Sequence, residues 1–317
     1  MVKARFHFHR ELNDFLARPL RRHTFACAFA KTSSTKHMIE SLGVPHTEVG
    51  LIVQNGRPVG FDAQIDADDL IEVYPARTTP EGMANGALLL RPPLRVADLC
   101  FIADAHLGGL TQLLRLAGFD TRYDNNFPDD EIEQLAQDEA RIVLTRDREL
   151  LKRRTVLRGY YVRALQPDEQ FREVSERFDF APNVRPFRLC LMCNAPLRRA
   201  GPGEIDGRVP DGVQERHSRF VTCDVCHRVF LSYHTVRHDC PRSVTCAVWA
   251  QGVGYTAPTP CRPHHCARRV AGCCASLRIV ANRFESVQIA DRLQGRFHAR
   301  RAARASGIAP TAQPRTP

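Results

Sequence analysis

Residues 99–104 read LCFIAD and residues 142–147 read IVLTRD, and these two apolar runs decide the fold of the middle of this 317-residue chain. Each run has the length of a buried strand and ends in a carboxylate. Neighbouring strands of a parallel α/β sheet end side by side, so Asp104 and Asp147 are predicted to face one crevice at the sheet edge. Two carboxylates so placed repel each other unless a cation lies between them, and a divalent metal ion is the usual one.

The segments around these runs alternate between helical and strand periodicity. A helix ended by Gly118 and a second helix capped by Asp129 or Asp130 are predicted between the two runs. The two further strands are expected at residues 121–123 and 159–162. This alternation predicts an α/β fold with a doubly wound parallel sheet of four strands over residues 98–181.

Residues 1–77 show a different order of elements. Strands are expected at residues 3–9, 24–30, 49–53 and 69–74, with a helix over residues 34–42 between the second and the third. Asn55-Gly56 is a strong signal for a tight hairpin. Strand, strand, helix, strand, strand is the order of a ubiquitin-like β-grasp fold. Residues 78–97 carry proline and glycine at the density of a linker, so a domain boundary is predicted there.

Composition places the chain among ordinary globular proteins, with 43% hydrophobic and 25% charged residues. The first residues lack the apolar core of a signal peptide, and no run approaches a membrane span, so we expect a cytoplasmic protein without a membrane partner. The net charge of +10 arises entirely after residue 234, where the chain has 13 arginines and three acidic residues. The rest of the chain is neutral, so its charge alone does not indicate what it binds.

Four of the 12 cysteines form two CxxC pairs, Cys190 with Cys193 and Cys223 with Cys226. Each pair places two thiolates on one tight turn, and two such turns close a tetrahedral Zn²⁺ site. A redox role is the alternative, which the presence of two pairs disfavours. Because sulfur fills all four positions the site is structural, and residues 182–233 are predicted to form a zinc ribbon. The glycine- and proline-rich residues 198–211 are expected to be an extended loop of this ribbon.

Four motifs occur in order along the chain: DAHLGGL at 104–110, LRLAGFD at 114–120, LTRD at 144–147 and CLMCNAPL at 190–197. With these motifs the chain resembles the Mut-seven C-terminal RNase domain family, a branch of the PIN-like nuclease fold. LGVPHTE at 42–48 and DLIEVYP at 69–75 are similar to the ubiquitin-like module found ahead of that RNase domain. The resemblance covers about residues 1–230. It implies a PIN-like core that holds Mg²⁺ or Mn²⁺ with three or four acids and hydrolyses RNA.

The acids that fit this chemistry lie at strand ends and helix starts. Asp104 and Asp147 are the candidate strand-end ligands of Mg²⁺ or Mn²⁺, and Asp130 at a helix start is the third. An acid at a helix start is also an ordinary cap or first-turn charge, which is the alternative for Asp130 and Asp147. The substitutes for the third ligand, and the candidate fourth, are Asp129, Glu131, Glu133 and Glu169.

Other side chains are candidates for contacts with an acid or with phosphate. Thr145 is a candidate to hydrogen-bond an acid or the attacking water. Arg115, Arg146 and Arg148 are candidate RNA-binding residues, because guanidinium groups bind phosphate with two hydrogen bonds. The alternative for each arginine is an ordinary solvated helix charge.

Residues 234–317 form an irregular basic tail without convincing periodicity. Three interpretations are open: a disordered RNA-binding arm, a second metal site, or a shifted reading frame translated out of register. The metal site would use Cys261, His264, His265, Cys266, Cys273 and Cys274. The abrupt loss of charge balance and family pattern favours the shifted reading frame.

The sequence therefore predicts a metal-dependent ribonuclease that hydrolyses RNA phosphodiester bonds in RNA processing or turnover. Mg²⁺ or Mn²⁺ would be held by Asp104, Asp130 and Asp147, and structural Zn²⁺ by the four cysteines. RNA is the expected partner, and the β-grasp module is a candidate site for a protein partner. The alternative is a non-catalytic RNA-binding or adaptor protein that works through its zinc ribbon and β-grasp module.

Overall fold

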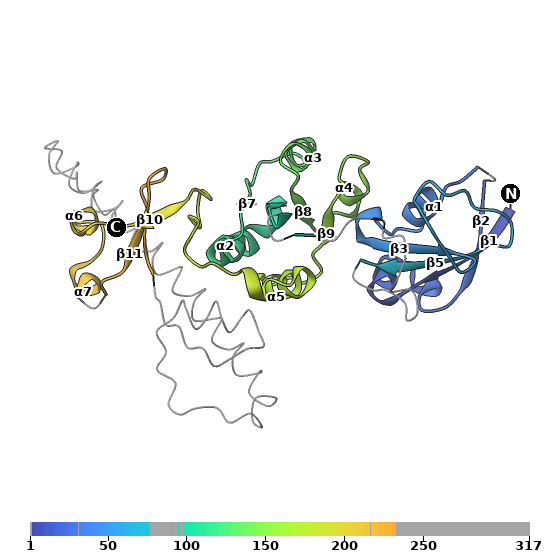
Figure 1. The fold of residues 1–317 in the computed structure, drawn as a ribbon, viewed down its shortest axis with the longest axis horizontal. Coiled ribbons are helices and arrows are strands. Elements are labelled where there is room, and N and C mark those ends of the chain that lie inside the picture. The colour runs from blue at the N-terminus through green and yellow to red at the C-terminus, as the bar shows by residue number, and fades with distance from the viewer. Residues whose placement is uncertain are drawn as a thin grey trace, which may run out of the picture. The chain divides into compact units, whose positions relative to one another are not determined.

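The computed structural model describes residues 2–30, 32–76, 90, 94–95, 98–215 and 217–232. It confirms the α/β fold class, with an N-terminal sheet and a central parallel sheet (Figure 1). Four cysteines also lie together in the described residues. The predicted tail at 234–317, with its cluster between Cys261 and Cys274, and most of the predicted linker lie outside the described residues. Within the described part of the chain, no helix has the length and apolar character needed to span a membrane.

The N-terminal module is a five-stranded sheet with the strand order β2-β1-β5-β3-β4. Its strands are β1 (Val2–Phe8), β2 (Phe25–Phe29), β3 (Val49–Gln54), β4 (Arg57–Val59) and β5 (Leu70–Pro75). β1 and β5 run parallel, and the other neighbours are antiparallel. Asn55 and Gly56 form the predicted hairpin turn between β3 and β4, and their φ values of 51° and 78° are both positive, as such a turn requires.

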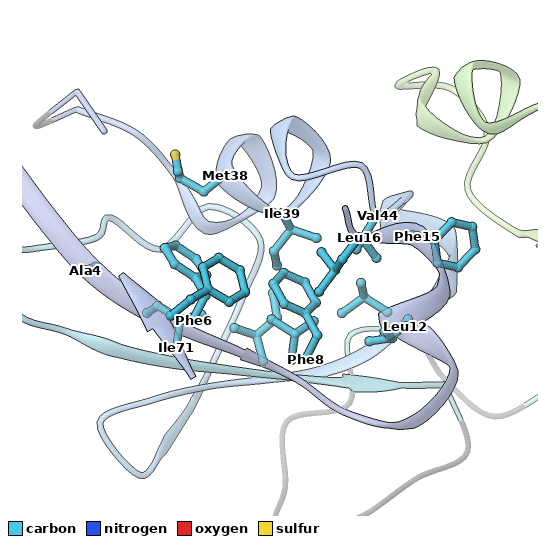
Figure 2. Close-up of a cluster of buried hydrophobic side chains, with 14 of the residues drawn as sticks. Ala4, Phe6, Phe8, Leu12, Phe15, Leu16, Met38, Ile39, Val44 and Ile71 are labelled. Carbon is cyan, nitrogen blue, oxygen red and sulfur yellow. The ribbon is translucent and has the colours of Figure 1, made fainter. Parts of the chain in front are cut away.

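One α-helix and three 3₁₀ segments accompany this sheet. They are α1 (Thr35–Ser41), η1 (Arg10–Phe15), η2 (Arg18–Leu20) and η3 (His46–Glu48). α1 begins where predicted, because the Ser34 side chain accepts a hydrogen bond from the His37 N–H. Figure 2 shows Phe6 and Phe8 of β1 packed beneath Ile39 of α1, and all three side chains are buried. The module therefore has its own hydrophobic core.

The central sheet has the strand order β7-β6-β8-β9, and every neighbouring pair is parallel. The strands are β6 (Phe101–Ala103), β7 (Thr121–Arg122), β8 (Ile142–Thr145) and β9 (Gly159–Tyr161). β6 and β8 are adjacent at the centre, and both are fully or almost fully buried because helices cover both faces. Asp104 follows β6 and Asp147 follows β8, so both aspartates lie at the carboxyl edge of the sheet.

The helices of this region lie on both sides of the sheet, α3 and α4 on one and α2 and α5 on the other (Figure 1). They are η5 (Ala105–Leu107), α2 (Gly108–Ala117), α3 (Asp129–Asp138), α4 (Arg148–Lys152), α5 (Pro167–Phe178) and η6 (Ala181–Asn183). α2 ends as predicted at Gly118, whose φ of 93° is left-handed. The predicted cap of α3 is wrong: Pro128 is the N-cap, and Asp129 and Asp130 lie in the first turn. Pro128 is already extended and its carbonyl accepts the first helical hydrogen bonds, so the helix needs no side-chain cap.

The third region is an antiparallel sheet with the order β10-β11-β12. Its elements are β10 (Leu197–Arg199), α6 (Pro202–Ile205), α7 (Asp211–Gln214), β11 (Phe220–Cys223) and β12 (Val229–Leu231). The expected extended loop at 198–211 instead contains the short helix α6. Glu204 accepts a hydrogen bond from the Gly201 N–H at 2.7 Å and so closes the first turn of that helix.

Buried polar contacts join the N-terminal module to the central sheet. The His46 ring lies 2.7 Å from a Glu40 carboxylate oxygen and 3.0 Å from the Val156 carbonyl oxygen. The Tyr161 N–H donates to Glu48 Oε1 at 2.6 Å. Burial raises the pKa of Glu48, against the opposing effect of nearby arginine charges. The 3₁₀ segment η3 of the N-terminal module therefore meets β9 and the segment before it through specific hydrogen bonds.

Candidate functional site

The carboxyl edge of the central sheet is organised by one buried hydroxyl group. Thr145, the last residue of β8, is 0% exposed. Its Oγ1 donates to Asp104 Oδ2 at 2.8 Å and accepts a hydrogen bond from the Asp147 N–H at 2.9 Å. The Asp104 N–H in turn donates to the Leu144 carbonyl at 3.0 Å. Thr145 thus couples the ends of the two central strands and holds the Asp104 carboxylate in one orientation.

Both aspartates also cap the helical turns that follow them. Asp104 accepts a hydrogen bond from the Ala105 N–H before η5, and Asp147 Oδ1 accepts one from the Glu149 N–H at 2.7 Å before α4. Asp147 therefore does cap α4, as the alternative interpretation of this residue expected. Each carboxylate oxygen has two lone pairs, and these hydrogen bonds leave acceptor capacity on both side chains. Asp147 Oδ2 has no hydrogen bond within the described part of the chain.

Asp130 lies elsewhere, on the exposed first turn of α3. Its side chain is 90% exposed and is paired with Arg153, which also binds Glu133 at 2.8 Å and Asp129 at 3.3 Å. These acids raise the pKa of Arg153, so the pair is firmly charged. In the described residues, one group of three or more potential ligands lies within 4.8 Å, and it consists of cysteines. The structure therefore does not bring Asp130 together with Asp104 and Asp147.

The remaining candidate acids are also dispersed. Glu131 is exposed in the first turn of α3, beside the acids that Arg153 pairs with. Glu169 is exposed in the first turn of α5, where it acts with burial to raise the pKa of its neighbour Asp168. The structure places neither acid in a ligand group with Asp104 or Asp147.

An acid that the sequence analysis did not single out follows the outer strand β7. Asp124 comes two residues after that strand and lies at the same sheet edge as Asp104, because β6 and β7 are parallel. The intervening Tyr123 donates its hydroxyl to the Ala105 carbonyl at 2.9 Å. Burial, and then the charges of Asp124 and Asp104, raise the pKa of Tyr123. The rule that located Asp104 and Asp147, a carboxylate after a parallel strand, also locates Asp124.

The three candidate RNA-binding arginines all bind backbone carbonyls. Arg146 donates to the Ala164 carbonyl at 2.9 Å, and Arg148 donates to the Phe15 carbonyl at 3.2 Å. Arg115 is 4% exposed, and its guanidinium is enclosed between α2 and the cysteine region. The structure therefore does not present Arg115 to solvent.

The four predicted zinc ligands do come together. The Sγ atoms of Cys190, Cys193, Cys223 and Cys226 all lie within 4.8 Å of one another. The Cys190–Cys226 and Cys193–Cys223 Sγ distances are both 3.4 Å. Tetrahedral Zn²⁺ with thiolate bonds of 2.3 Å requires sulfur atoms about 3.8 Å apart, so this donor set fits the ion. No open position remains for a substrate when four sulfurs surround one metal.

The first cysteine turn is hydrogen-bonded to the central sheet through two side chains. Arg115 donates to the carbonyls of Leu191 and Met192, at 3.1 and 2.8 Å, and to that of Thr121 at 2.9 Å. Asn194, left-handed with a φ of 66°, accepts from the Thr121 N–H at 3.1 Å and donates to Asp120 at 2.7 Å. The cysteine turn is therefore fixed to the start of β7.

The fold and these two sites define an α/β protein with a β-grasp module, an acidic edge on a parallel sheet and a tetracysteine ribbon. The family model described as Mut7-C RNAse domain matches residues 99–238, and that described as Mut7-C ubiquitin matches residues 1–80. The chain belongs to the Mut7-C RNase domain family and carries the ubiquitin-like module of that family. No curated protein and no solved structure matches the chain.

Proposed function

We propose that this protein is a metal-dependent ribonuclease that hydrolyses RNA phosphodiester bonds at the carboxyl edge of its central sheet. The observation that carries the proposal is the linkage of Asp104, Thr145 and Asp147 at the ends of two adjacent parallel strands. Membership of an RNase domain family supports it. In the same proposal the four cysteines hold structural Zn²⁺.

Asp104 and Asp147 have the chemistry that Mg²⁺ or Mn²⁺ requires, since both ions prefer carboxylate oxygens. When bound there, the ion would supply Lewis-acid stabilisation of the charge that develops on the phosphoryl oxygens. Thr145 would act as a positioning residue. Its hydroxyl donates a hydrogen bond to one Asp104 oxygen and so fixes the direction of the lone pairs that remain free on that carboxylate. Asp147 Oδ2 would be available to orient a water molecule against the scissile phosphate.

Two acids are candidates for the third metal ligand, Asp124 and Asp130. Asp130, the third ligand expected from the sequence, would have to leave Arg153 to join Asp104 and Asp147. Asp124 already follows a strand that ends at the same edge. Titration of Mn²⁺ into the Asp124→Asn and Asp130→Asn variants, followed by calorimetry, distinguishes them, since only loss of a true ligand weakens binding about tenfold or more.

The decisive experiment is cleavage of labelled single-stranded and structured RNAs by the full chain with Mg²⁺ or Mn²⁺. We expect cleavage by the wild type, and none by Asp104→Asn or Asp147→Asn. Asp206→Asn, which removes an exposed acid from the ribbon, is the matched control and should cut normally. Cleavage that survives in both the Asp104→Asn and the Asp147→Asn variants would contradict the assignment of these aspartates to the active site. Absence of cleavage by the wild type on every RNA and with both ions would contradict the function.

A non-catalytic RNA-binding or adaptor role is the second candidate, and the pairing of Asp130 with Arg153 favours it. A surface acid neutralised by arginine is an ordinary structural feature and provides no ligand. This role predicts that the wild type and the Asp104→Asn variant bind RNA equally, that neither cuts it, and that Mn²⁺ does not bind at the sheet edge.

A further inference from the structure

The β-grasp module contains an open basic pocket of about 380 Å³. The residues that line this pocket are His7, Phe8, His9, Arg10, Asn13 and Arg22. They come from β1, from η1 and from the turn after η2, and none of them is acidic. The module as a whole is close to neutral, so this local excess of cationic side chains is a property of the pocket and not of the composition.

One buried amide holds the two arginine-bearing turns of the pocket. Asn13 is 6% exposed, and its Nδ2 donates to the carbonyls of Phe8 and Arg10 at 2.7 and 2.9 Å. Its Oδ1 accepts a hydrogen bond from the Arg22 N–H at 2.6 Å. Because the donors and the acceptor of Asn13 all bind backbone, the relative position of the two turns is fixed before any ligand arrives.

Both arginines have a backbone conformation that is unfavourable for their residue type. The φ values of Arg10 and Arg22 are 51° and 63°, in the left-handed region where a side chain with a Cβ atom is disfavoured. Glycine would adopt these turns without strain. Arginine at both positions places two long cationic side chains on one pocket at a cost in stability, which is typical of binding sites.

The two arginines of the pocket are not paired with an acid in the part of the chain that the structure describes, whereas His9 has Glu72 beside it. Neither the Arg10 nor the Arg22 guanidinium has a hydrogen bond or ion pair within the described residues. The rings of His7 and His9 lie 4.4 Å apart along the strand, and His9 also stacks on Tyr74. Glu72 lies 3.5 Å from His9 Nε2 but does not line the pocket. Two free guanidinium groups beside two imidazoles suit a phosphate group.

The 3₁₀ segment η1 connects this pocket to the proposed catalytic edge. Arg10 and Asn13 belong to η1, and so does its last residue, Phe15. The Phe15 carbonyl accepts a hydrogen bond from Arg148, whose guanidinium lies 5.2 Å from the centre of the Phe15 ring. Arg148 directly follows Asp147. Six residues of 3₁₀ helix span about 12 Å, a length that a few nucleotides of a single strand cover.

We propose that the pocket formed by His7, His9, Arg10 and Arg22 binds a backbone phosphate of the RNA substrate, a few nucleotides from the bond that is cut. The inference rests on the proposed function and gives the β-grasp module a role in substrate binding. A backbone phosphate carries no base identity, so the pocket adds affinity and sets the position of the strand without selecting a sequence.

The test measures binding of a labelled single-stranded RNA to the full chain carrying Asp104→Asn, so that cleavage does not interfere. Adding Arg10→Gln with Arg22→Gln should weaken binding about tenfold and lower the slope of log affinity against log salt by about one per lost contact. The matched control adds Lys36→Gln with Arg57→Gln, which removes the same charge from the module away from the pocket. Equal RNA affinities of the pocket variant and the control would overturn the proposal. Absence of RNA binding by the chain that carries Asp104→Asn alone would also overturn it.

Two further arms separate the possible sources of failure. The first compares thermal unfolding, which must be equal in the pocket variant and the control. The second uses Arg10→Gly with Arg22→Gly, a pocket variant whose turns are unstrained and which should show the same loss of RNA affinity. Binding of an acidic peptide that is lost in the pocket variant while RNA binding is retained would overturn the proposal in favour of a protein partner. RNA cleavage by the wild type is measured separately, so failure of the proposed function and failure of the pocket give different results.

Discussion

Replacement of Arg115 by methionine tests the connection between the cysteine cluster and the central sheet. The guanidinium donates hydrogen bonds to three backbone carbonyls, those of Thr121, Leu191 and Met192. Methionine keeps much of the side-chain length but leaves these carbonyls without their donor. A hydrogen bond from a charged donor contributes about 1.5–3 kcal/mol, and the three are not independent. We therefore expect a loss of about 3 kcal/mol in the free energy of unfolding.

The same substitution should weaken metal binding. Four thiolates around one Zn²⁺ leave a net negative charge, and Arg115 is the buried cation beside the Cys190 turn. Urea unfolding measures the stability loss, and zinc release to a colorimetric chelator measures the affinity. Arg199→Met, an exposed arginine in β10 of the same ribbon, is the control and should change neither. A stability within about 0.5 kcal/mol of the wild type, together with unchanged zinc release, would refute the reasoning.

Three further predictions address other parts of the structure. Thr145→Val should lower RNA cleavage about tenfold to a hundredfold because Asp104 loses its hydrogen bond, and Thr145→Ser should restore it; equal activity of the valine variant would contradict the positioning role. Burial opposes ionisation of Asp120, but hydrogen bonds from Arg141 and Asn194 outweigh it and hold its pKa below the ordinary value. Ionised Asp120 therefore adds to the free energy of unfolding at every pH above the pKa of the unfolded state, about 3.9, and this stabilisation is lost as the pH falls through the lower pKa of the folded state. Urea unfolding should show Asp120→Asn less stable than the wild type by about 1 kcal/mol at neutral pH, with the difference vanishing in acid; a constant difference would contradict this sign. Gly118→Ala should cost about 3 kcal/mol in the same assay, because its Cβ would lie 2.2 Å from the Arg185 carbonyl oxygen at a φ of 93°. The control Gly56→Ala, also left-handed but with no atom near its Cβ, should cost only about 1 kcal/mol.

The parts of this fold that local sequence determines were predictable. The strands that precede Asp104 and Asp147 are continuous apolar runs, and a parallel pair necessarily brings their ends to one edge. Asn55-Gly56 and Gly118 fix turns through their own backbone preferences. Each CxxC turn fixes two of the four cysteines locally. The fold therefore had only to bring the two turns together.

The parts that depend on contacts distant in sequence were not predictable. Arg115 has the position of a solvated helix charge, but its partners Leu191 and Met192 lie more than 70 residues away. The pairing of Asp130 with Arg153 likewise joins the first turn of α3 to the residue that follows α4, and neither segment alone indicates the other. Asp124 is different: the sequence already predicts a strand at residues 121–123, and the rule that located Asp104 and Asp147 was not applied to the acid that follows this strand.

The short strands explain why the additional modules matter to the central sheet. Its strands have two to four residues each and span about 7–13 Å, so they provide few hydrogen bonds to fix their own positions. At the amino edge, Asn194 binds Asp120, and Asp120 binds Arg141, which also donates to the Phe101 carbonyl at the start of β6. At the carboxyl edge, Phe15 of the β-grasp module binds Arg148 beside Asp147. Each edge is therefore held by a separate module, and the position of Asp104 and Asp147 depends on both.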